Sequence, residues 1–140
     1  MTQVDFYILS DTSSQACSLF SCRLAEKAYK QGHRVFINTD STPQLKQLDD
    51  LLWTFRAGSF VPHAVYTEDC HAQPVLLGHG VDPEDHNDVL VNMANEIPAF
   101  FSRFERVAEL VGGDEKERTA ARERYRFYQD RGYTLNTHKI

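Results

Sequence analysis

The chain has 140 residues, a net charge of −5 and three cysteines. This length is typical of one domain, and we expect a single domain spanning residues 1–140. The acidic balance disfavours strong direct binding to nucleic acid or to acidic membranes. The odd number of cysteines, without a framework spacing, argues against a secreted disulfide fold. Because the N-terminus has no basic segment followed by a long apolar run, we expect a cytoplasmic protein.

The first half of the chain predicts two pairs of a strand and a helix. Residues 4–9 form an apolar run of strand type, and the helix after it ends at Gly32. Residues 34–39 predict a second strand, which we expect to run parallel to the first. Another helix opens at residues 42–43, where proline is tolerated in the first turn. The apolar face of this second helix holds Leu45, Leu48, Leu51, Leu52 and Phe55.

The second half predicts more strands and one long helix. Strand-type runs occupy residues 60–66, 74–77 and 88–93. Residues 101–111 fit either a helix or an edge strand, and both interpretations stay open. Asp114, with Glu117 three residues later, is typical of a helix start, so we expect a last helix from there to about Arg131. We expect the tail, residues 133–140, to be an extended segment. Such alternation favours a three-layer α/β/α sandwich with a mostly parallel sheet.

A phosphate-binding loop is the first catalytic feature to test. The turn from Ser10 to Ser14 follows the first strand, where a nucleotide phosphate binds in many α/β folds. It contains no glycine and matches neither common Gly-rich phosphate-binding pattern. We therefore interpret it as a helix cap and expect a Rossmann-like fold without a phosphate-binding loop.

A metal site or an activated cysteine would be the other signs of an enzyme. The loop from Cys70 to His86 has candidate ligands, but their spacing matches no zinc motif, and a solvated loop is favoured. Cys17 lies on the apolar face of the first helix and Cys22 lies off it, without an activating pattern. We expect no cofactor and no metal. The alternative is a nucleotide- or metal-dependent hydrolase that uses the Ser10–Ser14 turn or these loop residues: Cys70, His71, His79, Asp82, Asp85 and His86.

Trp53 marks a candidate protein-binding surface. At 100° per residue it points away from the apolar face of the second helix. It either packs under a loop of its own chain or is exposed for a partner, and the sequence favours neither interpretation. The bulky segment from Phe60 to His63 follows closely. Tryptophan is enriched at protein–protein hot spots, which makes this region a candidate for docking.

The expected last helix is a second candidate surface. It carries Arg118, Arg122 and Arg126 at four-residue spacing, with Tyr125 beside them. Between positions 118 and 131 there are five arginines against two acidic residues, whereas the whole chain is acidic. Arginine forks bind carboxylates and stack on aromatic rings. A solvated helix face is the more common interpretation of such a row, but the charge asymmetry favours an anionic ligand.

Three blocks of sequence resemble the chi subunit family of bacterial DNA polymerase III. They are DFYIL at residues 5–9, LDDLLW followed by SFVPH between residues 48 and 63, and ARERYRFY followed by GYTLNT between residues 121 and 137. The resemblance covers essentially the whole chain in order. It implies a non-catalytic accessory of the clamp-loader complex whose fold lacks a phosphate-binding loop.

The resemblance also implies two partners in DNA replication. One is the psi subunit, whose contact would fall on Trp53, Phe60, Val61, Pro62 and His63. The other is the acidic C-terminal tail of single-stranded DNA-binding protein, whose pocket would be formed by Arg122, Tyr125 and Arg126. A member of the family has lysine at the position of Arg126, which keeps the charge but changes the geometry of the donor.

Overall fold

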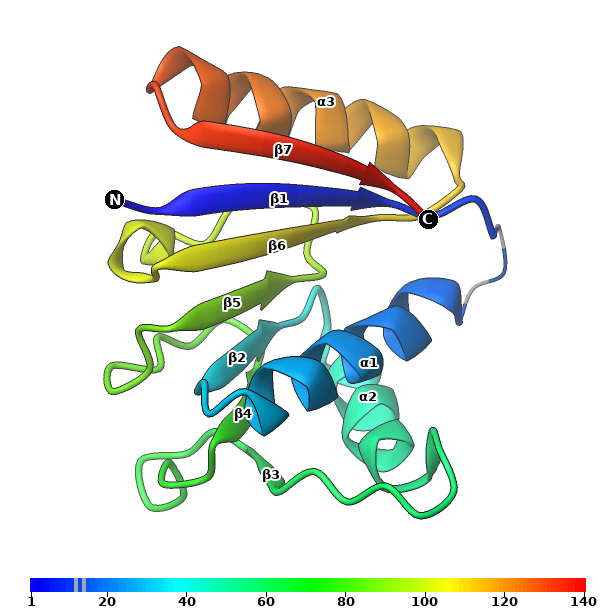
Figure 1. The fold of residues 1–140 in the computed structure, drawn as a ribbon, viewed down its shortest axis with the longest axis vertical. Helices are drawn as coiled ribbons and strands as arrows, with labels where there is room; N and C mark the ends of the chain where they lie inside the picture. The colour runs from blue at the N-terminus through cyan, green and yellow to red at the C-terminus, as the bar shows by residue number, and fades with distance from the viewer. Residues whose placement is uncertain (12, 14) are drawn as a thin grey trace.

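A computed structural model describes residues 1–11, 13 and 15–140. Within these residues strands and helices alternate over most of the chain, as the sequence predicts (Figure 1). The elements are β1 Gln3–Ile8, α1 Ala16–Lys30, β2 Val35–Asn38, α2 Thr42–Thr54, β3 His63–Val65, β4 Val75–Gly78, β5 Val89–Asn92, the 3₁₀ helix η1 Phe101–Arg103, β6 Arg106–Val111, α3 Glu115–Asp130 and β7 Thr134–Lys139.

The strands form one sheet in the order β3-β4-β2-β5-β6-β1-β7. Every neighbouring pair in it is parallel, which confirms the predicted class of fold. Strands β1 and β2 run parallel as expected, but β5 and β6 lie between them. The edges of the sheet are therefore β3 and β7. They are far apart in Figure 1, with α2 near the first edge and α3 near the second.

Two apolar layers hold the helices on the sheet. On one face, α1 and α2 bury residues such as Cys22 and Leu48 against Ile37 and neighbouring strand residues. On the other face, α3 buries Ala121 and Tyr128 against β1 and β6. Beside α3 this second face is covered by the segment around η1, including Phe101 and Phe104. The result is a three-layer α/β/α sandwich.

Local sequence explains the starts of α2 and α3 and the end of α1. At the start of α1 the cap position is Gln15, outside the Ser10–Ser14 turn that was predicted to cap this helix, and Gln15 makes no side-chain capping hydrogen bond. The Ser41 hydroxyl accepts a hydrogen bond from Gln44 N at the start of α2, and the Asp114 carboxylate accepts one from Lys116 N at the start of α3. Gly32 has a φ of 87° after the end of α1, a conformation that favours glycine. No helix in the described part of the chain is both long enough and apolar enough to cross a membrane.

Two expectations need correction. Of the two interpretations of residues 101–111, the strand holds for the second half, but the strand is not at an edge: η1 turns the chain, and β6 lies inside the sheet between β5 and β1. The segment is apolar on both of its sides because an interior strand is covered on both faces. Cys22, which the helical pattern places off the apolar face, is fully buried, whereas Cys17 is only partly buried. α1 packs against α2 as well as against the sheet, so more than one side of this helix is covered.

Candidate functional site

Trp53 and Phe60 together form an exposed aromatic surface, which we call the aromatic pair. Trp53 is 56% exposed and Phe60 is 65% exposed, and their ring centres lie 5.8 Å apart. Trp53 belongs to the last turn of α2, and Phe60 belongs to the loop between α2 and β3. Within the described residues Trp53 is therefore not buried under a loop, and of the two interpretations left open by the sequence, the exposed one holds.

The residues that follow Phe60 support this surface from below. Val61 is 1% exposed and belongs to the core, so it cannot contact a partner in the folded chain. His63 is also buried, with its ring centre 4.6 Å from that of Trp53. Its two ring nitrogens face the carbonyl oxygens of Val61 and Asp49 at 2.6 and 3.2 Å. Pro62 is half-buried. The predicted set therefore divides into an exposed pair and a supporting group.

A hollow of about 310 Å³ lies between α3 and the end of the sheet near β7. We call it the basic hollow. Its floor is mainly apolar and comes from Phe6, Ile8, Val111, Ala121 and Thr137. Its rim is formed by Arg118, Arg122, Tyr125 and Lys139. Cationic rim and apolar floor together suit a ligand that has both carboxylates and an apolar end.

The structure brings two of the three residues predicted for the tail pocket into this hollow. Arg122 and Tyr125 line it, and the Tyr125 ring lies edge-on to Phe6 at 5.3 Å. Arg126 is exposed on the same helix but does not line the hollow. Arg122 is 3.7 Å from the exposed Glu115 carboxylate. An exposed pair of this kind is weak and leaves the guanidinium available to a ligand.

Arg118 lines the hollow but was not included in the predicted pocket. Its Nε is buried and has no hydrogen-bond partner in the described part of the structure. A buried donor without an acceptor is costly, so this nitrogen would gain from an anionic ligand. The four-residue spacing from Arg122 was the sequence signal that could have identified it. Lys139, at the end of β7, adds another cation from a segment distant in sequence.

One of the arginines of α3 faces the opposite way. Arg124 is 6% exposed, and its Nε donates to Oε1 of the fully buried Glu109 at 2.9 Å. Tyr128 donates to the other carboxylate oxygen at 2.7 Å, and Asn92 donates to both. Burial raises the pKa of Glu109, and the positive charge of Arg124 opposes that change. The surface of α3 is therefore less basic than its composition indicates.

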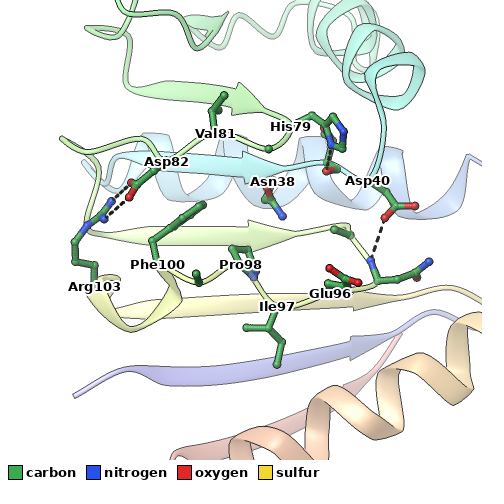
Figure 2. A pocket seen from close by; sticks show the side chains of 15 residues that line it. Asn38, Asp40, His79, Val81, Asp82, Glu96, Ile97, Pro98, Phe100 and Arg103 are labelled. Carbon is green, nitrogen blue, oxygen red and sulfur yellow. Dashed lines mark hydrogen bonds and ion pairs between the residues drawn. The ribbon is translucent and has the colours of Figure 1, made fainter.

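A wider groove of about 970 Å³ begins at the carboxyl ends of β2, β4 and β5 and extends along the sheet to Asp82 and Arg103 (Figure 2). Ligands often bind at the carboxyl ends of the strands in α/β sheets. At one end, Arg103 forms a two-pronged pair with Asp82 at 2.7 and 3.0 Å. Asp40 and Glu96 add carboxylates on the opposite side. Since Asp82 already neutralises Arg103, the charge of this groove disfavours a nucleotide phosphate.

Among the described residues, the segments suggested for the alternative hydrolase do not form a recognisable site. Thr12 and Ser14 lie outside the described residues, and the described Ser13 donates its backbone N–H to Asp11 at 2.8 Å. In the Cys70–His86 loop, His71 faces Asp85, His79 faces a carbonyl oxygen and His86 is buried. The described part of the chain holds no group of three side chains that could bind one metal ion.

The helix cysteines are poor candidates for a nucleophile. Burial raises the pKa of the Cys17 thiol to about 11 and that of Cys22 to about 12, with nearby Glu117 adding to the effect at Cys17. The thiolate is the reactive form of cysteine, and it is scarce at neutral pH when the pKa is this high.

Comparison with solved structures finds a similar fold. The chain resembles T4 UvsW with a TM-score of 0.68 and 8% sequence identity. The match covers 99% of this chain, which spans about 41% of the UvsW chain. At this identity the similarity concerns the fold alone.

Comparison of sequences gives a more specific result. The family model described as DNA polymerase III chi subunit, HolC, matches residues 1–136. The DNA polymerase III subunit chi of Pseudomonas aeruginosa is 44% identical over 140 residues, with 100% of this chain and 98% of the relative covered. The subunits of the same name from Haemophilus influenzae and Escherichia coli are each 30% identical, and the matches cover 96% and 98% of this chain and 95% and 97% of the relatives. The chain therefore belongs to the DNA polymerase III chi subunit family.

Proposed function

We propose that this protein is a non-catalytic adaptor in DNA replication that joins two other proteins. The aromatic pair would bind the psi subunit of DNA polymerase III. The basic hollow would bind the acidic C-terminal tail of single-stranded DNA-binding protein. The observation that carries the proposal is the combination, in one small hollow, of cationic side chains on the rim and an apolar floor.

The chemistry of the hollow supports a peptide with acidic residues and an apolar C-terminal residue. Guanidinium groups bind carboxylates through charge-assisted hydrogen bonds, and Arg118 and Arg122 stand one helical turn apart on the rim. The floor between Phe6 and Val111 offers apolar contact for a terminal side chain. Since the protein as a whole is acidic, such a ligand must be attracted by this local charge and not by the net charge.

The aromatic pair supports a different kind of interface. Two large rings exposed side by side are unusual on the surface of a protein that has no partner. Trp and its neighbours form hot spots because they bury much area with few rotatable bonds. We infer that the psi subunit covers this surface by apolar burial.

The two surfaces belong to opposite ends of the sheet. The aromatic pair lies next to β3, and the basic hollow lies against β1 and β7 (Figure 1). Two different proteins can therefore each occupy one of these sites without touching each other. This separation supports an adaptor, because the two partners can be bound at the same time.

The proposal is tested by forming the three-component complex from purified proteins. Wild-type protein is mixed with psi subunit and with a tail peptide, and both affinities are measured by calorimetry. Trp53→Ala should weaken binding of psi and leave binding of the peptide unchanged, whereas Arg122→Ala should do the opposite. Each variant is thus the control for the other. Loss of both affinities in either variant would contradict two separate sites.

A further inference from the structure

The loop that carries Phe60 is held in place by contacts with α1. Neither Trp53 nor Phe60 belongs to that helix. Residues 55–62 connect α2 to β3, and Gly58 within them has a φ of 75°, which favours glycine. Within the loop, Ser59 N donates to the carbonyl oxygen of Arg56 at 3.2 Å. The Phe60 side chain is 65% exposed and lies at the end of this turn. One local hydrogen bond would not by itself fix the direction of such a ring.

Glu26 of α1 supplies the missing constraint. Its side chain is only 8% exposed, and its carboxylate accepts a hydrogen bond from the Ser59 hydroxyl. The other carboxylate oxygen lies 2.6 Å from Nη2 of Arg56. Lys30, one turn further along α1, is 3.8 Å away. The contacts with Ser59 and Arg56 join α1 to both ends of the turn before Phe60.

The residue after Phe60 completes a two-sided attachment. Val61 is 1% exposed in the core layer beneath α1 and α2. Ser59 is therefore tied to Glu26 on one side of Phe60, and Val61 is buried on the other. Phe60 is exposed where the adjacent Val61 is buried, and its ring lies beside that of Trp53.

We propose that Glu26 is a positioning residue for partner recognition: it holds the Phe60 loop so that the aromatic pair is formed before the partner arrives. The proposal rests on the proposed binding of psi at the aromatic pair. A surface that is ordered in advance binds more tightly because the partner does not have to order it. Glu26 itself is largely hidden behind Ser59 and Arg56 and acts through Phe60.

The contacts also indicate that the charge of Glu26 matters. The hydrogen bond from Ser59 lowers the pKa of the Glu26 carboxyl, and the charges of Arg56 and Lys30 lower it further against the opposing effect of burial. The carboxylate form is thus the one that holds the loop. A neutral amide in its place could still accept from Ser59, but it would lose the attraction to Arg56.

A double-mutant cycle separates positioning from a general effect on folding. Binding of purified psi subunit from the same organism is measured for wild type, Glu26→Ala, Phe60→Ala and the double variant. Glu26→Ala should weaken binding about tenfold when Phe60 is present and by less than about twofold when Phe60 is absent. Glu26→Gln should give an intermediate loss. Glu123→Ala, which removes an exposed carboxylate from α3, is the control and should bind as wild type does.

Limited digestion with trypsin tests the loop without any partner. Arg56 is a trypsin site that Glu26 holds against α1, so cleavage after Arg56 should be several-fold faster in Glu26→Ala and faster in Glu26→Gln than in wild type. If wild type fails to bind psi, the proposed function fails, yet this digestion still decides whether Glu26 holds the loop. If Glu26→Ala does not fold, psi binding and trypsin cleavage are both measured with Glu26→Gln instead. An equal loss of affinity with and without Phe60, or unchanged cleavage after Arg56, would overturn the proposal.

Discussion

Arg124 and Glu109 form a buried ion pair that attaches the inner side of α3 to strand β6, with 2.9 Å between Nε and Oε1. Tyr128, one turn further along α3, donates to the same carboxylate. These two contacts fix how α3 is rotated on the sheet. Arg118, Arg122 and Tyr125 are turned by the same rotation toward the basic hollow. The Arg124–Glu109 pair therefore orients the residues on the rim of the basic hollow but does not itself line that hollow.

We expect Arg124→Met to destabilise the protein by about 3 kcal/mol, because it leaves the Glu109 carboxylate buried without its partner. The measurement is the free energy of unfolding from urea titrations at neutral pH. Arg122→Met, on the exposed side of the same helix, is the matched control and should change stability by less than about 0.5 kcal/mol. Equal effects of the two substitutions would show that the buried pair contributes no more than an exposed arginine.

The sequence predicts most of the fold because the strands and helices have clear periods. Strand β2 and helix α2 were expected within a few residues of where they lie, and the turn residues before them mark their limits. Segment 101–111 was ambiguous because β6 is covered on both faces. An apolar run of this kind shows neither the alternation of a half-buried strand nor the period of an amphipathic helix. Only the order of strands in the sheet resolves such a case, and that order depends on contacts distant in sequence.

The candidate sites were less predictable, for two physical reasons. An arginine is normally exposed, so nothing in the pattern distinguished the buried Arg124 from Arg122 until Glu109 was placed beneath it. Phe60 and Val61 are both apolar and adjacent, and one of the two had to be buried, but period alone does not say which. Whether Trp53 was covered likewise depended on a loop whose path the sequence does not specify.

We expect Trp53→Ala to leave folding nearly unchanged while it weakens binding of psi by about 2 kcal/mol or more. The side chain is 56% exposed, so its removal opens no cavity of core size. Thermal unfolding and calorimetric titration measure the two effects on the same samples. Leu52→Ala, at the preceding position but 1% exposed, is the contrasting variant and should lose about 2–5 kcal/mol of stability. A large loss of stability in Trp53→Ala would indicate that the ring is a core residue.

We expect the contribution of Glu26 to stability to depend on pH. Its pKa is lowered in the folded protein, chiefly by the Ser59 hydrogen bond, from an ordinary value of 4.5. The stabilisation is therefore complete above that ordinary value and decreases as the pH falls through the pKa of the folded state. Glu26→Gln cannot titrate, so the difference in unfolding free energy between wild type and this variant should shrink on acidification. Urea titrations across the acidic range measure it, and a difference that stays constant would contradict the assignment.

The last prediction concerns the basic hollow and a peptide that ends in acidic residues and one apolar residue. Arg118→Ala and Arg122→Ala should each weaken binding about tenfold or more, because each removes a charge-assisted hydrogen bond worth roughly 1.5–3 kcal/mol. Arg126→Ala should cost less, about two- to threefold, since this exposed residue does not line the hollow and acts only through its charge.

Salt dependence separates the two kinds of arginine. Screening weakens attraction between exposed charges, so wild-type affinity for the peptide should fall as salt rises, and part of this dependence should disappear in Arg126→Ala. The control is Arg131→Ala, whose guanidinium lies over the Phe127 ring at 3.6 Å and lines none of the basic hollow. Fluorescence anisotropy of a labelled peptide at low and moderate salt measures all four variants. If Arg131→Ala weakens binding as much as Arg122→Ala does, the attraction comes from the general charge of α3, and the hollow is not the binding site.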